Sequence, residues 1–140
     1  MQKIFLISFQ GEKAPQVLKK KKVGLGKLNN MNCIFCKIIE GSIPSKKIFE
    51  NDELIAFHDI HPIDKVHFLI TPKKHIENLI SCNEADKEII SNMLLLAPKL
   101  AKEQGLQGFR TMINSGAEGG QEVFHMHFHV YGGSSKLAKI

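Results

Sequence analysis

Histidine and apolar positions alternate strictly along residues 124–130. The histidines are His125, His127 and His129, and the apolar residues that separate and follow them are Met126, Phe128 and Val130. Successive side chains of a β-strand point to opposite faces of a sheet, so this pattern predicts a strand over residues 125–131. We therefore expect the three imidazoles to share one face while the apolar residues pack into the core.

The rest of the chain after residue 32 predicts four more strands and two helices. A short helix is expected over residues 33–40 and strands over residues 46–50, 54–59, 66–71 and 109–114, with a long helix between the last two strands. The other connections between successive strands are short, which favours antiparallel pairing. The sequence therefore predicts an α+β domain built on an antiparallel sheet.

The long helix is predicted from a helical repeat of apolar residues. Ser81 and Glu84 fit a capping box at its start, and Gly105 fits its end. The residues of the apolar stripe are Ile90, Met93, Leu94, Ala97, Leu100 and Ala101. Such a stripe packs on the sheet or forms an interface with a second chain.

The charge of the chain is unevenly distributed. The formal net charge is +5, but residues 1–30 hold seven lysines and one acidic residue, whereas residues 31–140 hold 12 basic and 13 acidic residues. A nearly neutral domain gives no support for nucleic-acid binding. We therefore divide the chain into a flexible basic extension over residues 1–31 and one folded domain over residues 32–140.

The extension does not fit a secretory signal, because its apolar run over residues 4–9 is short and no small-residue cleavage site follows. No apolar segment approaches the roughly 20 residues that span a bilayer. We therefore expect a cytoplasmic protein with no membrane partner.

A row of neutral imidazoles suits two kinds of chemistry. It can bind a metal, or it can supply a nucleophile with hydrogen-bonding neighbours for transfer of an anionic group. The segment before the histidines is polar and carries Gly116, Gly119 and Gly120, whose backbone N–H groups could approach a phosphate. Glycine-rich hairpin loops also occur without any ligand, so this segment indicates phosphate binding only in combination with the histidines beside it.

Cys33 and Cys36 form a C-x-x-C motif. The motif alone fits zinc binding, redox chemistry or two ordinary thiols. Three cysteines in a chain without a secretory signal argue against a disulfide framework, and Cys82 is expected to be an ordinary thiol on the long helix.

The run from His125 to Tyr131 resembles the histidine-triad signature, in which three histidines alternate with apolar residues and two apolar residues end the motif. Further matching positions are Asn114, residues 119–121, residues 57–60, His67 and residues 71–75. The chain is thus similar to the nucleotide-binding branch of the histidine-triad (HIT) superfamily over about residues 32 to 133. The resemblance implies a five-stranded antiparallel sheet with one long and one short helix, and a homodimer with a continuous ten-stranded sheet.

The activity that the resemblance implies is hydrolysis of a nucleotide phosphoramidate or a related nucleotidyl compound, with a purine nucleotide (an AMP or GMP derivative) as substrate. His127 is the implied nucleophile, and His125 and His129 complete the catalytic set. The alternatives are hydrolysis of dinucleoside polyphosphates and a nucleotide-binding scaffold with incidental turnover. No organic cofactor is expected.

The resemblance also implies the residues that contact the nucleotide. These residues are Phe35, Ile38, Phe57, Asp59, Ile60, Asn114, Gly120, Gln121, Glu122, His127 and His129. On sequence alone, the four apolar members fit the core, Asp59 fits a turn cap and Asn114 fits a turn at a strand end. Glu122 is unusual at its position, because an ionised glutamate accepts hydrogen bonds and cannot donate one to phosphate.

Some relatives bind a structural zinc through a similar cysteine pair and two histidines. The resemblance places the ligands at Cys33, Cys36, His67 and His125, a closed set of four. His58, His61 and His75 are expected to have no functional role, with His75 at the start of a short helical turn.

Overall fold

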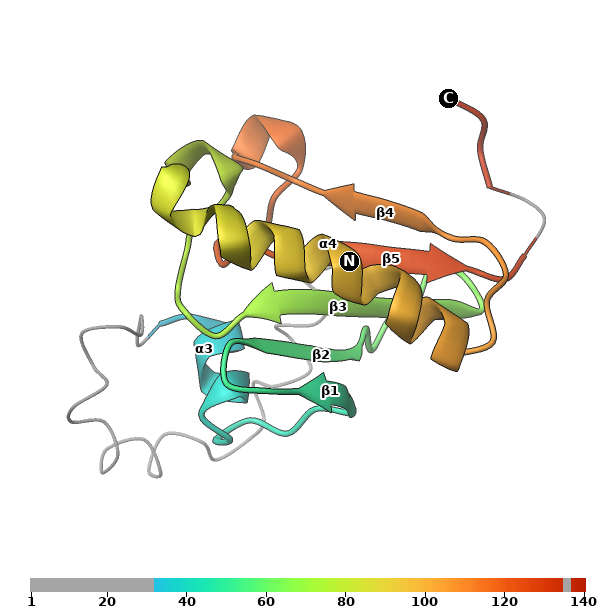
Figure 1. The fold of residues 1–140 in the computed structure, drawn as a ribbon, viewed down its shortest axis with the longest axis horizontal. Coiled ribbons are helices and arrows are strands. Elements are labelled where there is room, and N and C mark those ends of the chain that lie inside the picture. The colour runs from blue at the N-terminus through green and yellow to red at the C-terminus, as the bar shows by residue number, and fades with distance from the viewer. Residues whose placement is uncertain (1–31, 135–136) are drawn as a thin grey trace.

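The computed structural model describes residues 32–134 and 137–140, so the expected N-terminal extension lies outside the described residues. The strands are β1 (Lys47–Glu50), β2 (Leu54–His58), β3 (Val66–Pro72), β4 (Arg110–Ile113) and β5 (Phe128–Gly132). They form one sheet in the order β1-β2-β3-β5-β4, and every neighbouring pair is antiparallel (Figure 1). The predicted α+β class and five-stranded antiparallel sheet are confirmed.

The described chain has a short helix, α3 (Ile34–Ile39), and a long helix, α4 (Lys87–Glu103). Three single turns of 3-10 helix, η2 (Leu79–Ser81), η3 (Glu84–Asp86) and η4 (Ala117–Gly119), lie in the connections. None of the helices in the described residues has the length and apolar character needed to cross a membrane.

The start of the long helix differs from the prediction. The structure has two successive capping boxes, one formed by Asn78 with Ser81 and the next by Asn83 with Asp86. Each opens a 3-10 turn, and α4 follows the second one at Lys87. The Ser81–Glu84 pairing was therefore wrong, because two short turns precede the helix and asparagine side chains cap both of them.

The sheet separates two apolar clusters. The larger cluster lies between α4 and the sheet, where Met93 and Leu100 pack with Phe68 and Val130. The smaller cluster joins α3 to the other face through Phe35, Phe57 and neighbouring aliphatic residues. Within α4 the buried residues are Met93, Leu96, Ala97, Leu100 and Ala101. The predicted stripe was right except at Leu94, which is 48% exposed, and Leu96 takes the buried position instead.

The predicted histidine strand begins later than expected, at Phe128, so His125 and His127 precede the ladder of β5. The β3–β5 pairing ends at the Ile70–Phe128 pair. Beyond that pair, the Thr71 hydroxyl donates to the Met126 carbonyl (2.8 Å), and Pro72 has no N–H with which to continue a ladder. The alternation itself holds, because Met126, Phe128 and Val130 all pack in the α4 cluster.

Candidate functional site

The ring of His127 is held in one tautomer. Its Nδ1 lies 2.7 Å from the backbone carbonyl of His125, and a carbonyl can only accept, so Nδ1 carries the proton. In the neutral ring the lone pair is then on Nε2. Burial lowers the pKa of His127 to about 4, and the neighbouring rings of His125 and His67 lower it further against the effect of that hydrogen bond. His127 is therefore a neutral imidazole with a defined nucleophilic nitrogen near pH 7.

A second buried group consists of Asp59, His67 and His129. The N–H of Ile63 donates to Nδ1 of His67 (3.2 Å), so His67 carries its proton on Nε2 and donates to Nδ1 of His129 (3.0 Å). One oxygen of Asp59 lies 3.6 Å from the same Nε2. Burial lowers the pKa of His129 to about 3, and in its neutral form His129 carries its proton on Nε2.

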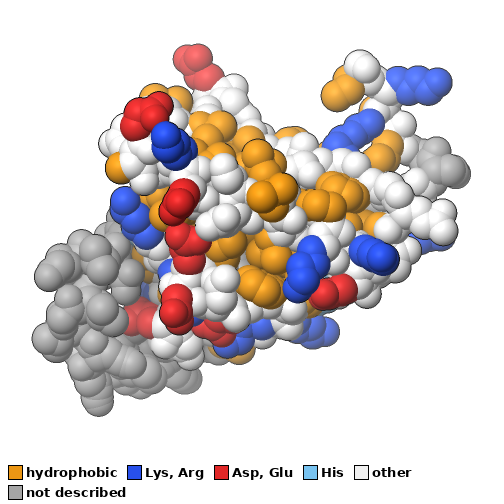
Figure 2. Space-filling view, in the orientation of Figure 1, with side chains coloured by type: hydrophobic (Ala, Val, Ile, Leu, Met, Phe, Trp, Pro, Cys, Tyr) orange, Lys and Arg blue, Asp and Glu red, His pale blue; other side chains and the backbone are white. Residues whose placement is uncertain are grey.

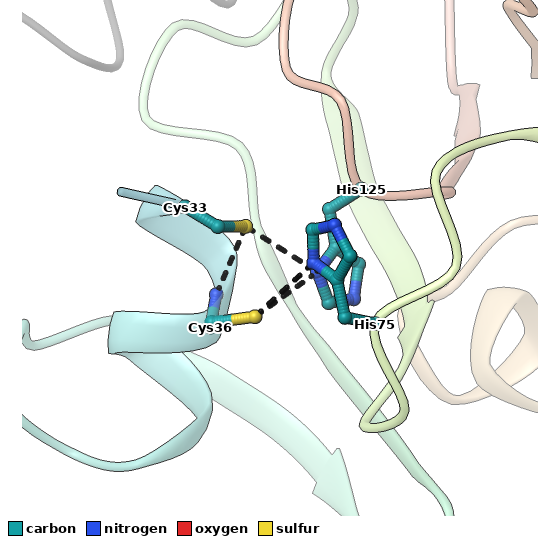
Figure 3. A group of neighbouring side chains, drawn as sticks. All are labelled: Cys33, Cys36, His75 and His125. Atoms are coloured by element: carbon teal, nitrogen blue, oxygen red, sulfur yellow. Dashed lines mark hydrogen bonds between the residues drawn. The ribbon is translucent and has the colours of Figure 1, made fainter. Parts of the chain in front are cut away.

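Four side chains converge between α3 and the segment before β5. Figure 3 shows the sulfur atoms of Cys33 and Cys36 pointing from the start of α3 toward the rings of His75 and His125. The ligand atoms of these four residues all lie within 4.8 Å of one another. Nδ1 of His125 is 3.4 Å from Sγ of Cys33 and 3.6 Å from Sγ of Cys36, and Nδ1 of His75 is 3.3 Å from Sγ of Cys36.

The protonation states in this cluster suit a cation. Nε2 of His125 donates to the Pro72 carbonyl (2.8 Å), which leaves the Nδ1 lone pair directed at the cluster. Nδ1 of His75 lies 3.1 Å from Nδ1 of His125. Hydrogen bonding from Cys36 lowers the pKa of the Cys33 thiol, against the effect of burial, and so favours the thiolate that metals bind.

The predicted fourth ligand, His67, was wrong, because the structure places His75 beside the cysteines. In the β3–β5 register His67 lies opposite Tyr131, six residues from His125, which is about 20 Å along an extended chain. His75 follows the end of β3 and folds back toward the cysteines. His75, which was expected to have no functional role, thus lies in the same cluster as the two cysteines and His125. Its place in the matching 71–75 segment was the signal that could have found it.

The turn before the histidines, residues 116–121, is called the glycine loop below. Its backbone closes on itself, because the N–H groups of Gly119 and Gln121 both donate to the Gly116 carbonyl. Gly116 and Gly120 have φ values of 81° and 90°, which side-chain-bearing residues rarely adopt. Asn114 donates to the Gly120 carbonyl at 3.4 Å. The side chain of Glu122 is exposed, while the flanking Gln121 and Val123 are buried.

The four predicted apolar contacts divide into two groups. Phe35, Ile38 and Phe57 are buried in the α3 cluster, and the ring of Phe35 meets that of His127 edge-on with centroids 4.9 Å apart. Ile60 lies outside that cluster and is 39% exposed. The structure thus brings Phe35 to the nucleophile. The contacts of these residues with a base stay predictions.

Comparison with known proteins defines the family. Residues 32–139 match the family described as "Scavenger mRNA decapping enzyme C-term binding". The protein HitA of Neisseria gonorrhoeae is 43% identical over 102 residues, which cover 72% of this chain and 95% of HitA. The chain belongs to the histidine-triad (HIT) family, as the signature at His125 to Tyr131 predicted.

Two solved structures show the same fold. A HIT family hydrolase from Legionella pneumophila is 45% identical, with a TM-score of 0.72 and coverage of 74% of this chain and 95% of that chain. A histidine triad protein from Clostridium difficile is 43% identical, with a TM-score of 0.76 and coverage of 80% and 98%. The chain is therefore similar to hydrolases of the HIT family over nearly their whole length.

Proposed function

We propose that this protein hydrolyses nucleotide phosphoramidates or related nucleotidyl compounds derived from purine nucleoside monophosphates. The observation that carries the proposal is the Nδ1–H bond from His127 to the His125 carbonyl, which leaves the lone pair of a neutral ring on Nε2. A fixed, uncharged imidazole is a suitable nucleophile for phosphorus. The similarity to HIT family hydrolases supports the same class of reaction.

The proposed reaction has two steps. Nε2 of His127 forms a bond to the α-phosphorus as the bond from phosphorus to the leaving group breaks, and the leaving group departs with the electron pair of that bond and takes up a proton. Water then attacks the nucleotidyl-histidine, which releases the nucleoside monophosphate and restores the ring. His129 has its proton on Nε2, so it can donate to a phosphate oxygen.

The remaining predicted contacts complete the proposed nucleotide site. Asp59 would accept the ribose hydroxyls, and Phe35, Ile38 and Phe57 would line the base. The Asp59 carboxylate already accepts the His61 N–H (2.9 Å), so its orientation is fixed before a ligand arrives.

The test is hydrolysis of adenosine 5′-phosphoramidate and of a diadenosine polyphosphate by the wild-type protein, His127→Ala and His61→Ala. His61 is exposed and lies outside the triad, so its variant is a matched control. We expect the wild-type protein and the control to prefer the phosphoramidate and His127→Ala to lose at least about 10³-fold in kcat. Preference for the dinucleotide would select that substrate class, and binding of AMP without cleavage of either compound would select the scaffold alternative.

We also propose that the Cys33–Cys36–His75–His125 cluster binds a structural zinc ion. A tetrahedral zinc with ordinary Zn–S and Zn–N bonds separates its ligand atoms by roughly 3.3–3.8 Å. Four of the six separations among the ligand atoms of His75, His125 and the two cysteines are 3.1–3.6 Å, close to that geometry, and all six are within 4.8 Å. A closed set of four ligands leaves no position for substrate, so zinc here would join α3 to the triad segment and leave the chemistry to His127.

A homodimer is the third part of the proposal. β4 is an edge strand, and its outer backbone groups can pair with those of a second copy. Leu94 and Leu95 of α4 are 48% and 72% exposed, and Met112 of β4 is also exposed. Figure 2 shows hydrophobic side chains gathered on the face that carries α4 and β4. Pairing through this face would bury them and extend the sheet to ten strands. Cys33 and Cys36 are both reduced, which suits the proposed cytoplasmic location.

A further inference from the structure

The side chain of Gln121 makes four hydrogen bonds within the protein and is 4% exposed. Its Oε1 accepts from the Gly116 N–H (2.8 Å) and from Nδ2 of Asn78 (3.0 Å). Its Nε2 donates to the carbonyls of Glu77 (2.8 Å) and Val123 (3.1 Å). These bonds use both donors and both acceptor sites of the amide. A direct bond from this side chain to a phosphate would cost one of them.

Backbone groups fix the orientation of both amides. The Gly116 N–H is a donor, so the Gln121 atom that faces it is the oxygen, and the Glu77 carbonyl requires the nitrogen on the other side. The Ile80 N–H donates to Oδ1 of Asn78 (3.0 Å), so Asn78 presents Nδ2 to Gln121. Rotation of either amide by 180° would set donor against donor or acceptor against acceptor.

Asn78 is itself held firmly. It is 6% exposed and caps η2 in a capping box with Ser81. Two residues earlier, the Ile76 carbonyl accepts the N–H of Met126 (2.7 Å), between the first two histidines of the triad. The 76–78 segment is thus bonded both to the glycine loop and to the histidine segment.

We propose that Asn78 is a positioning residue that sets the glycine loop for phosphate through Gln121. Gln121 then acts on the phosphate by fixing the backbone of Gly116 and not by contact of its own amide. This inference rests on the proposed function for the loop's role toward phosphate. The hydrogen-bonded path from Asn78 to the Gly116 N–H is independent of it.

Two substitutions at Asn78 separate this role from helix capping. Asn78→Asp keeps an oxygen for the Ile80 N–H but sets a second acceptor against Oε1 of Gln121. Asn78→Ser keeps a capping hydroxyl and is too short to bond Gln121, and it serves if the buried carboxylate prevents folding. Asn83→Asp and Asn83→Ser are matched controls, because Asn83 caps η3 in the same way, is exposed, and has Ala85 and Asp86 as its partners.

The experiment measures three properties of the full-length wild-type protein and these variants. They are amide hydrogen exchange of residues 116–121, AMP affinity by calorimetry, and kcat and KM for adenosine 5′-phosphoramidate. We expect the Asn78 variants to exchange the Gly116 amide at least about tenfold faster, since its acceptor loses a fixed position. We expect the AMP Kd and the KM to rise about tenfold while kcat stays within about threefold, because the bonds of His127 are unchanged.

Each result decides between the alternatives. Unchanged exchange at Gly116 in folded Asn78 variants would overturn the proposal, and so would faster exchange with unaltered Kd and KM. Equal losses of activity in the Asn78 and Asn83 variants, with a fall in kcat as well as a rise in KM, would assign Asn78 a capping role only. If the wild-type protein neither binds AMP nor cleaves the substrate, the proposed function fails, and the exchange data alone still confirm or refute the positioning of the loop by Asn78.

Discussion

Each histidine of the triad has one ring nitrogen bound to a different partner, and that partner decides what the other nitrogen can do. His125 donates to the Pro72 carbonyl, so its second nitrogen faces the cysteines. His127 donates to the His125 carbonyl, so its second nitrogen is nucleophilic. His129 accepts from His67 and keeps a proton to donate. Three identical side chains thus have three different proposed roles: metal ligand, nucleophile and phosphate donor.

The zinc proposal makes a prediction at the scale of single residues. His75→Ala removes one of the four converging ligand atoms, so we expect the zinc content to fall from about one equivalent per chain to a small fraction of that. His67→Ala is the control, because His67 bonds His129 and lies outside the cluster. Mass spectrometry of the metal content, on protein purified without a histidine tag, checks this. Equal zinc in the two variants would contradict the ligand set.

At the scale of the element, β5 carries a histidine on a face that is buried. Two features allow this: the hydrogen bond from His67, and an environment that keeps the ring neutral. Burial contributes most to the low pKa of His129, and the neighbouring rings of His127 and His67 add to it. Protonation of this strand is therefore coupled to unfolding.

The pH dependence of stability follows from that coupling. In the unfolded chain His129 takes up a proton near pH 6.5, whereas in the folded chain its pKa is about 3. Between these values the unfolded state binds more protons, so the free energy of unfolding rises with pH through this window and is flat above it. Near pH 5, we expect His129→Gln to reduce the slope of the free energy of unfolding against pH by up to about 1.4 kcal/mol per pH unit.

Urea denaturation of the wild-type protein and His129→Gln, at several pH values between about 4.5 and 7.5, measures this slope. His67, whose pKa burial also lowers, is present in both proteins and contributes to both slopes in the same direction. Parallel curves for the two proteins would show that His129 is not the titrating group.

At the scale of the whole molecule, the face that carries α4 and β4 is the proposed dimer interface. Leu95→Glu places a charge on that face, so we expect a monomer at concentrations where the wild-type protein is a dimer. Ile80→Glu is the control, because Ile80 is similarly exposed at 75% but lies on η2. Sedimentation equilibrium gives the masses. A monomeric wild-type protein, or a dimer in both variants, would contradict the assignment of this face.

The local pattern of the chain predicted much of this protein. The alternation around the triad and the stripe of α4 follow the fixed periods of strands and helices, so the sequence predicts them. The short strand connections predicted the antiparallel pairing. The family followed from the histidine signature. Two departures lie where a period does not apply: two capping boxes delayed the start of α4, and Pro72 helped to end the β3–β5 ladder at Phe128, so that His127 lies outside it. A third departure lies inside α4, where Leu94 is exposed and Leu96 is buried.

By itself the sequence determined the class of fold, the family and the histidine face. Only the tertiary structure decided which residues act together. It replaced His67 by His75 beside the cysteines, assigned a tautomer to each ring of the triad, and joined Gln121 to Asn78. These partners are 39 or more residues apart or depend on a backbone carbonyl, so they are set by strand register and loop path. Neither of these is encoded in a local period of the sequence.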